Sequence, residues 1–306
     1  MPATLFQGLL VPAITPFDAS LAPDAKAFVD ICRWLLADGA HGLAVFGTTS
    51  EANALSVGER MGLLEHLVLA GVDASVLLPG TGMCSLVDAV ALTRHAVALG
   101  AGGVLMLPPF YYKPVGEDGL FAFYSEVIVR VGSSVLGLWL YHIPQNTGVG
   151  IPHGLIERLV ARYPKTVLGI KDSSGNWENV ETMLRAYPGF RVFPSSEGVL
   201  SKAMALGAVG CITASGNINA RGIRALYDGA GSPNAADLQA RVARVRDIVS
   251  GYPPLIPAVK TILAERLGRP GLARMRPPLV PLTGEQTSTL LGALDAAGHV
   301  IVPPKA

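Results

Sequence analysis

Eight short runs of apolar residues recur along this chain, and longer amphipathic stretches separate most of them. This spacing is typical of alternating strands and helices rather than of a sandwich of two sheets. Most runs are apolar throughout, as expected for parallel strands that are buried on both faces. The runs cover residues 8–17, 41–47, 75–82, 102–109, 135–144, 167–174, 190–196 and 207–216. The pattern predicts an α/β fold, a (β/α)8 TIM barrel.

The chain is longer than such a barrel requires, because it has 306 residues and a barrel needs roughly 250. The alternation of strands and helices stops after Asp228, and residues 229–234 are rich in residues typical of loops. Helical patterns follow over 235–268 and 284–297. We therefore predict a catalytic barrel over residues 1–232 and a helical C-terminal domain over residues 233–306.

The composition is strongly apolar, with 50% hydrophobic and 15% charged residues. A chain of this kind needs a large core or a buried subunit interface, so we expect an oligomer. The longest uncharged apolar stretch, 96–112, contains glycines and prolines and falls short of the roughly 20 residues of a membrane span. No basic residue precedes Lys26 and no signal-peptide cleavage site is visible, so we expect a cytoplasmic protein without membrane contact.

The charge and the metal-binding residue types exclude several functions. The net charge is +1 without a basic stripe, which argues against nucleic acid and favours a small neutral or anionic substrate. The six histidines have no metal-site spacing, and no glycine-rich nucleotide loop follows a strand. We therefore expect no metal and no nucleotide cofactor. Cys32, Cys84 and Cys211 are far apart, and we expect reduced thiols that serve buried packing.

Lys171 is the most informative single residue, because it follows the apolar run Val-Leu-Gly-Ile. Catalytic groups of a barrel lie at the carboxyl ends of the strands. An ordinary lysine, with a pKa of about 10.4, is a poor nucleophile at neutral pH, but desolvation favours the neutral amine that can form an imine. From this residue alone, a lysine that extends into solvent or pairs with Asp172 is an equally good interpretation.

Three further segments follow strands and carry groups that could act on a substrate. Tyr141 ends the preceding run and could shuttle protons, although a strand-end tyrosine in water is the commoner case. The turn of residues 47–51 could hold a carboxylate with its hydroxyls and backbone N–H groups, but such turns are common. The aromatic residues 110–112 could cover the core, form a dimer contact or line the site.

Together these motifs resemble the dihydrodipicolinate synthase and N-acetylneuraminate lyase family of class I pyruvate-dependent aldolases. The resemblance spans the whole chain and rests on Gly47-Thr48-Thr49-Ser50-Glu51, Tyr111, Tyr141-His142-Ile143-Pro144 and Gly169-Ile170-Lys171-Asp172. It implies that Lys171 forms an imine with pyruvate and that Tyr141, Thr48 and Tyr111 relay protons, with Tyr111 reaching a neighbouring subunit. It further implies a homotetramer built as a dimer of dimers, with no cofactor beyond the covalent imine. The substrate-binding residues that the resemblance implies are Gly47, Thr49, Asn146, Ser196 and Ile212, beside Thr48.

Four positions depart from the family pattern. Asn146 stands where dihydrodipicolinate synthases carry an arginine that grips the carboxylate of the aldehyde substrate, and asparagine cannot form a bidentate charged pair. His142 replaces an asparagine, and Ser50 and Ser196 replace glycines. We therefore expect an altered pocket for the second substrate.

Asn146-Thr147-Gly148 together with Lys171-Asp172-Ser173 resembles 4-hydroxy-2-oxoglutarate aldolases more than lysine-pathway enzymes. This likeness implies a lyase that condenses pyruvate with a small aldehyde or 2-oxo acid, or releases pyruvate. The alternatives are a 4-hydroxy-tetrahydrodipicolinate synthase or a 2-oxo acid dehydratase of the same family. A protein that only senses a 2-oxo acid, without catalysis, is a further alternative.

Overall fold

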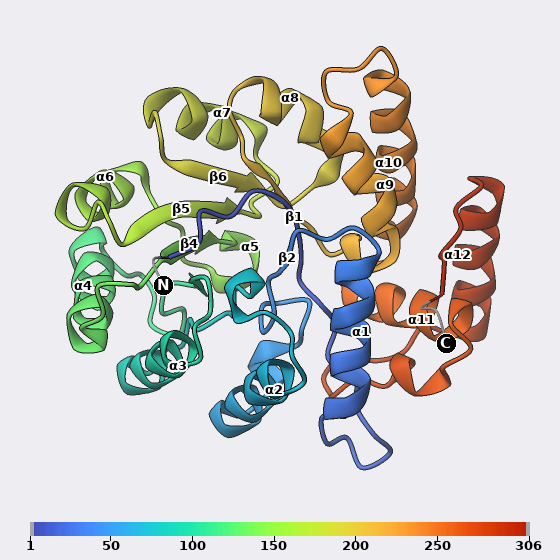
Figure 1. Ribbon diagram of the computed structural model, residues 1–306, viewed down its shortest axis with the longest axis horizontal. Coiled ribbons are helices and arrows are strands. Elements are labelled where there is room, and N and C mark those ends of the chain that lie inside the picture. Colours follow the sequence, from blue (N-terminus) through green and yellow to red (C-terminus); the bar gives the residue numbers. More distant parts are fainter. Residues whose placement is uncertain (1–2, 304–306) are drawn as a thin grey trace.

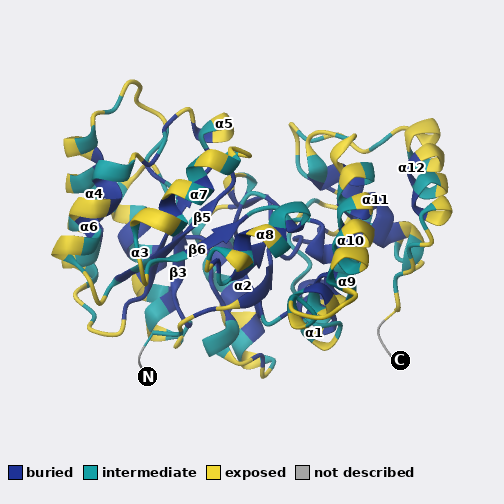
Figure 2. Cartoon of the chain, turned by 90° about the horizontal axis from the view of Figure 1, so that it is seen from above, coloured by how far each residue is buried: buried dark blue, intermediate teal, exposed yellow. Residues whose placement is uncertain are grey.

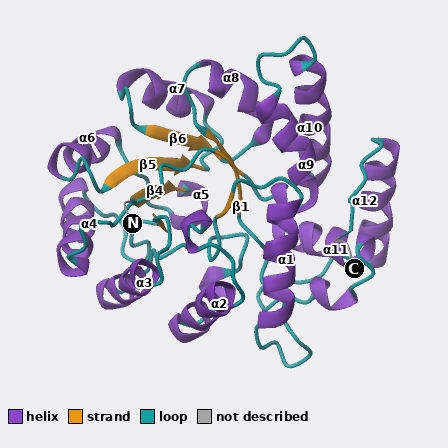
Figure 3. Cartoon of the chain, in the orientation of Figure 1, coloured by secondary structure: helices purple, strands orange, loops and turns teal. Residues whose placement is uncertain are grey.

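The computed structural model describes residues 3–303, in which parallel strands are enclosed by a ring of helices (Figure 1; Figure 3). The assigned strands form two sheets in the orders β2-β1-β7 and β3-β4-β5-β6. Their bounds are β1 Gly8–Val11, β2 Gly42–Leu43, β3 Val104–Met106, β4 Leu138–His142, β5 Val167–Asp172, β6 Arg191–Pro194 and β7 Gly210–Ile212.

Backbone hydrogen bonds join the two sheets into a closed barrel. On one side, residues 77–80 bridge β2 to β3: the N–H of Leu78 donates to the carbonyl of Leu43 at 2.8 Å, and that of Leu105 to Pro79 at 2.9 Å. On the other side, the N–H of Val209 donates to the carbonyl of Val192 at 3.2 Å, which connects β7 to β6. The predicted α/β barrel is thereby confirmed.

The third predicted strand, 75–82, is the exception. Its beginning lies in a 3-10 helix, η2 (Ala74–Val76), and only isolated parallel bridges at Leu77 and Gly80 join it to the neighbouring strands. Pro79 lies between those bridges and has no N–H to donate, so a regular hydrogen-bond ladder cannot form. The segment occupies the wall of the barrel, but the prediction of a regular strand was wrong.

Several of the helices begin at a side chain that caps the first turn. Asp24 accepts a hydrogen bond from the backbone of Ala27, and Ser56 with Glu59 forms the capping box that the sequence predicts. The helices around the barrel are α1 Ala25–Ala37, α2 Val57–Leu69, α3 Leu86–Ala98, α4 Glu117–Val131, α5 Pro144–Thr147, α6 His153–Arg162, α7 Trp177–Ala186, α8 Leu200–Ala205 and α9 Gly216–Asp228. Further 3-10 turns are η1 Ala52–Ala54, η3 Glu197–Val199 and η4 Pro270–Ala273.

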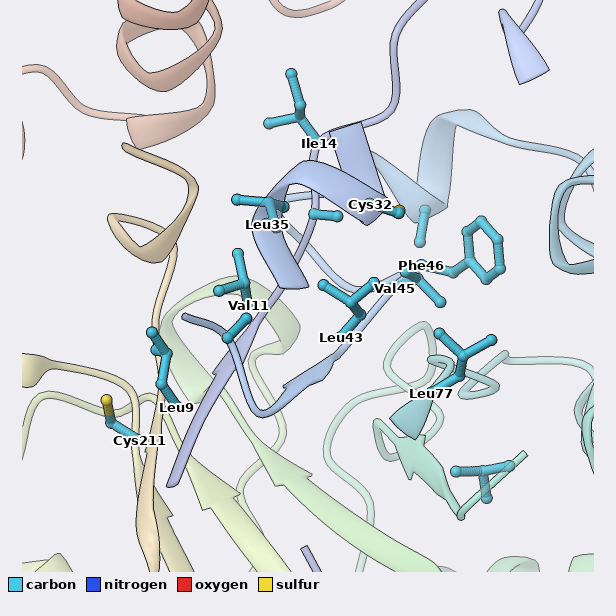
Figure 4. Packing of buried hydrophobic residues seen from close by; sticks show 14 of the residues in the cluster. Leu9, Val11, Ile14, Cys32, Leu35, Leu43, Val45, Phe46, Leu77 and Cys211 are labelled. Carbon is cyan, nitrogen blue, oxygen red and sulfur yellow. The ribbon is translucent and has the colours of Figure 1, made fainter. Parts of the chain in front are cut away.

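Side chains alternate between the interior of the barrel and the helices around it, as successive residues of a strand must. The outward set packs on the helices: Figure 4 shows Val11 and Leu43 beside Leu35 of α1. The inward set forms a separate cluster. Its members are Phe6, Leu10, Ala44, Leu78, Leu105, Trp139, Tyr141, Ile143, Phe193 and Ile212.

The C-terminal part consists of α10 (Ala235–Ser250), α11 (Leu255–Arg266) and α12 (Gly284–Ala296). The predicted helical stretch 235–268 is interrupted between α10 and α11 by Pro253 and Pro254, since proline cannot continue a helix. Helix α11 is buried at every position from Ile256 to Ala264 (Figure 2). The predicted domain boundary at residues 232 and 233 lies in the loop between α9 and α10, and the division into domains stays a prediction.

No helix within residues 3–303 combines the length and the hydropathy that crossing a bilayer requires.

Candidate active site

Lys171 and Tyr141 face each other inside the barrel. They are register partners on β5 and β4, and both side chains belong to the inward face. The Lys171 Nζ donates a hydrogen bond to the Tyr141 hydroxyl at 3.3 Å and lies 4.4 Å from the centre of its ring. Lys171 is 5% exposed and Tyr141 3%. The amine is therefore held in a shielded site against a group that can donate and accept protons.

Thr48 extends this pair into a chain of three polar groups. Its Oγ1 lies 3.1 Å from the Tyr141 hydroxyl, within hydrogen-bond distance. The order Lys171, Tyr141, Thr48 joins the ends of β5, β4 and β2, which are far apart in the sequence. Because both hydroxyls can act as donor or acceptor, the chain can pass a proton to or from the amine.

Asp172 does not pair with Lys171. Its side chain accepts hydrogen bonds from the Ser174 hydroxyl at 2.6 Å and from the Asn179 amide at 2.6 Å. Successive strand residues point to opposite sides, so Asp172 faces the helices while Lys171 faces the interior. The alternative interpretations of Lys171, a surface lysine or a partner of Asp172, are wrong.

The loop of residues 47–51 has a constrained backbone. Phe46 and Glu51, on either side of Gly47, Thr48 and Thr49, have φ angles of 58° and 56°, a conformation that side chains rarely adopt. Gly80 packs beneath it so closely that a Cβ atom there would lie 2.1 Å from the Phe46 carbonyl oxygen. The loop thus presents its hydroxyls and N–H groups in one defined arrangement.

Ser50 supports this loop from within the core. It is completely buried, and its hydroxyl donates to the carbonyl of Ala13 at 2.6 Å, while the Thr15 hydroxyl donates to the Ser50 carbonyl at 2.7 Å. The serine in place of glycine therefore anchors the loop to the segment after β1.

His142 also lies away from the barrel interior. Its Nδ1 accepts a hydrogen bond from the N–H of Ile151 at 2.9 Å, and its ring lines a surface cleft beside α6. Burial lowers the pKa of His142, Asp172 opposes this shift, and the hydrogen bond from Ile151 requires an unprotonated Nδ1. His142 therefore lies behind β4, and the altered pocket for the second substrate stays a prediction.

The other predicted site residues are more widely spread. Ile212 is completely buried in the inward cluster. Asn146 is exposed on the short helix α5. Tyr111 is 75% exposed, and its ring packs edge-on against Tyr112 at 5.4 Å. Within this single chain, Tyr111 does not join the group formed by Lys171, Tyr141 and Thr48.

Ser196 lines a cleft of 470 Å³ above the ends of β5 and β6. A group of polar side chains that the sequence analysis missed adjoins this cleft. Glu197 is completely buried and accepts hydrogen bonds from the hydroxyls of Thr213 and Ser215, while Arg246 of α10 lies over these hydroxyls. Thr213 and Ser215 lie 16 and 18 residues after Glu197, and Arg246 lies farther along the chain, so no local pattern could have revealed the group.

A second missed residue is Arg60, which lines a narrow cavity together with Gly47, Thr48 and Tyr141. Its guanidinium donates to the Gly80 carbonyl, and its Nε has no hydrogen-bond partner within the described residues. Burial lowers the pKa of Arg60 to about 10.

Neither the cysteines nor the metal-binding residue types form a further candidate site within the described residues. Cys32 and Cys211 are buried, which raises the pKa of both thiols. Cys84 is exposed, so the expectation of buried packing was wrong for that residue. Across residues 3–303, no three histidine, cysteine, aspartate or glutamate side chains are grouped so that they could hold a metal ion.

Comparison with known proteins gives matches over nearly the whole chain. The model of the "Dihydrodipicolinate synthetase family" matches residues 5–297. A DapA-like lyase of Chloroflexus aurantiacus, itself uncharacterized, is 35% identical over 94% of this chain and 96% of its own length. A 4-hydroxy-tetrahydrodipicolinate synthase of a Synechococcus species is 32% identical over 96% of both chains.

Two solved structures share the fold. Dihydrodipicolinate synthase from Agrobacterium tumefaciens superposes with a TM-score of 0.89 at 30% identity, covering 95% of this chain and 99% of that one. YagE, an E. coli prophage protein of the dihydrodipicolinic acid synthase family, was solved in complex with pyruvate. It superposes with a TM-score of 0.88 at 26% identity, covering 97% of this chain and 100% of that one.

Proposed function

This chain belongs to the dihydrodipicolinate synthetase family of lyases, and on that premise we propose that Lys171 forms an imine with pyruvate in an aldolase-type reaction. The observation that carries the proposal is the hydrogen bond from the Lys171 amine to the Tyr141 hydroxyl inside the barrel. A buried amine next to a proton-transfer group is what imine chemistry requires. The pyruvate bound to the related E. coli protein supports this choice of substrate.

In the proposed mechanism, the neutral amine of Lys171 attacks the carbonyl carbon of pyruvate, and the carbonyl oxygen takes up a proton. Tyr141 and Thr48 relay the protons that convert this carbinolamine into an iminium ion and water. The positive nitrogen then accepts electron density when a proton leaves the methyl carbon, which gives the enamine. The enamine carbon attacks the carbonyl of the second substrate, and water releases the product from Lys171. The reverse sequence cleaves the same carbon–carbon bond.

The loop of residues 47–51 is the proposed site for the pyruvate carboxylate. It begins four residues after the end of β2, and Thr48 contacts Tyr141, so a carboxylate held there would place the carbonyl of pyruvate near Lys171. Hydroxyl groups and backbone N–H groups are suitable donors for a carboxylate. We assign this role to Gly47, Thr48 and Thr49.

The second substrate distinguishes the remaining candidate activities. The proposed reaction uses a short aldehyde or 2-oxo acid, as in 4-hydroxy-2-oxoglutarate aldolases, because Asn146 supplies no charge at its position. The alternative, a 4-hydroxy-tetrahydrodipicolinate synthase, is supported by the names of several relatives. Turnover of pyruvate with glyoxylate and with aspartate semialdehyde, measured side by side, separates the two. A 2-oxo acid dehydratase would instead release water from a single substrate, and a sensor would bind without turnover.

Borohydride reduction tests the imine itself. The intact protein is incubated with pyruvate and borohydride, digested and analysed by mass spectrometry. We expect a reduced pyruvate adduct on Lys171 and none on the exposed Lys202, which is the control. Lys171→Ala should abolish both the adduct and turnover. An unmodified Lys171 in an otherwise folded protein would contradict the proposal.

A further inference from the structure

We infer that Arg246 binds an anionic group of the second substrate, so that the electrophile is a carboxylate-bearing aldehyde or oxo acid. This inference rests on the proposed function and concerns the half of the reaction that follows imine formation. The cleft of 470 Å³ at the ends of β5 and β6 is lined by Asp172 and Ser173, which follow Lys171 directly in the chain, and by Arg246 of α10.

The guanidinium of Arg246 is held at one nitrogen. Its Nη1 donates to the Thr213 hydroxyl at 3.2 Å and to the Ser215 hydroxyl at 3.4 Å. Its Nε and Nη2 have no hydrogen-bond partner within residues 3–303. The side chain is 18% exposed. Because a guanidinium presents its donors in a rigid planar fork, fixing one nitrogen orients the others. Arg246 therefore retains donors for a ligand.

The nearby carboxylate of Glu197 does not form a direct hydrogen bond with Arg246. The Glu197 Oε2 lies 3.9 Å from the Arg246 Nη1, beyond hydrogen-bond distance. Both Glu197 oxygens already accept hydrogen bonds from Thr213 and Ser215. A completely buried carboxylate of this kind favours a cation nearby, which explains why Arg246 lies here. Because Glu197 and Arg246 form no direct hydrogen bond, a second anion can reach the guanidinium from the cleft.

The other charged residues that line the cleft, Asp172 and Asp247, cannot take the place of Arg246 as an anion-binding group. Asp172 directs its oxygens to Ser174 and Asn179. Asp247 is exposed on α10 and forms no ion pair with Arg246 within the described residues. The remaining polar groups near the reacting end belong to Ser173, Ser195 and Ser196. A small anionic electrophile would thus meet hydroxyl groups and one guanidinium.

The position of Arg246 explains why the residue at position 146 can be uncharged. Asn146 is exposed on α5, at the opposite side of β5 from α10. Its neighbour Gln145 donates to the carbonyl of Ser173 at 2.6 Å and so closes the cleft on that side. We infer that α10, from the C-terminal part of the chain, supplies the charge for the second substrate.

The test compares an anionic and a neutral two-carbon aldehyde, glyoxylate and glycolaldehyde, with pyruvate in both cases. The wild-type protein should have a kcat/KM for glyoxylate at least tenfold higher than for glycolaldehyde. Arg246→Gln should lower kcat/KM for glyoxylate by about tenfold to hundredfold, the range for a charged hydrogen bond, and leave glycolaldehyde within about twofold. Arg246→Lys keeps the charge but loses the planar arrangement of donors. Its kcat/KM for glyoxylate should lie between the values of the wild type and of Arg246→Gln. Arg244→Gln, at an exposed arginine two residues earlier on α10, is the matched control and should change neither value.

Two outcomes would overturn the inference. One is a wild-type protein that uses both aldehydes equally well, a measurement that does not depend on the folding of any variant. The other is an Arg246→Gln protein that loses both activities equally, as expected of a structural role. Imine formation with pyruvate alone, followed by borohydride reduction, should be unchanged in Arg246→Gln. Failure of that reaction in the wild type would refute the proposed function rather than the role of Arg246.

Discussion

Lys260 of helix α11 donates a hydrogen bond to the carboxylate of Glu51, and both side chains are almost completely buried. The backbone N–H of Arg276 donates to the other oxygen of the same carboxylate at 3.2 Å. Burial lowers the pKa of Lys260, whereas the charge of Glu51 opposes that shift. Because Glu51 ends the loop that carries Thr48 and Thr49, the C-terminal part of the chain holds the proposed carboxylate site in place.

Removal of this buried amine should strongly destabilise the fold. Lys260→Met leaves the Glu51 carboxylate buried without its partner, and breaking a buried pair in this way costs about 3–5 kcal/mol. We expect a loss of that size in the free energy of unfolding, measured by denaturant titration. The double variant Glu51→Gln with Lys260→Met should recover part of the loss, because no uncompensated charge remains. A single variant as stable as the wild type would show that water or a relaxed loop compensates Glu51.

Loss of the Tyr141 hydroxyl should impair catalysis without unfolding the barrel. In Tyr141→Phe the proton path between Lys171 and Thr48 is interrupted, and general acid–base groups contribute about a hundredfold to ten-thousandfold to rates. We expect kcat to fall by about a hundredfold or more, measured by pyruvate turnover. Tyr124→Phe, a buried tyrosine whose hydroxyl contacts only the carbonyl of Met106, is the control. Equal activity of both variants would remove Tyr141 from the proton relay.

Tyr111 provides a test of active sites shared between subunits. It is exposed in the single chain, whereas the family resemblance implies that it reaches the site of a neighbouring subunit and takes part in the proton relay there. Coexpressed Lys171→Ala and Tyr111→Phe subunits should regain activity, because one of the two sites in a mixed pair is then complete. Lys171→Ala mixed with Tyr141→Phe should stay inactive, since each barrel carries its own defect. Mixed oligomers without regained activity would contradict a shared site.

The ion pair of Glu59 and Arg276 should contribute to stability in a pH-dependent manner. The hydrogen bonds from Arg276 are the main cause that lowers the pKa of Glu59 from 4.5 to about 2. A carboxyl whose pKa is lower in the folded state stabilises the fold above its unfolded value and loses that effect as the pH falls. The stability difference between wild type and Glu59→Gln should therefore shrink between pH 4.5 and about 2.

Thermal unfolding at several pH values measures this difference. The control is Glu126→Gln, which removes an exposed pair with Arg130 on α4 and should change the stability little at any pH. A Glu59→Gln difference that stays constant across this range would exclude the ion pair as its source.

Local patterns in the sequence were sufficient to predict the barrel and its helix starts. The apolar runs predict seven of the eight wall segments as strands because burial on both faces selects apolar residues at every position. The capping box at Ser56 is a short-range hydrogen-bond pattern between two residues that are three positions apart. The run at 75–82 misled the prediction because apolarity does not distinguish a regular strand from an extended segment interrupted by Pro79.

The sequence alone determined which residues of this chain stand at strand ends, including Lys171 and Tyr141. It could not determine which side of the barrel wall such a residue faces, and the structure places the side chains of Ser50 and His142 away from the barrel interior. Only the tertiary structure brought Lys260 to Glu51, 209 residues apart, and Arg246 to Thr213, 33 residues apart. Such pairs depend on how α10 and α11 pack on the closed barrel. Hydrophobic periodicity shows only which face of each helix or strand is buried, and it does not show which other element packs against that face.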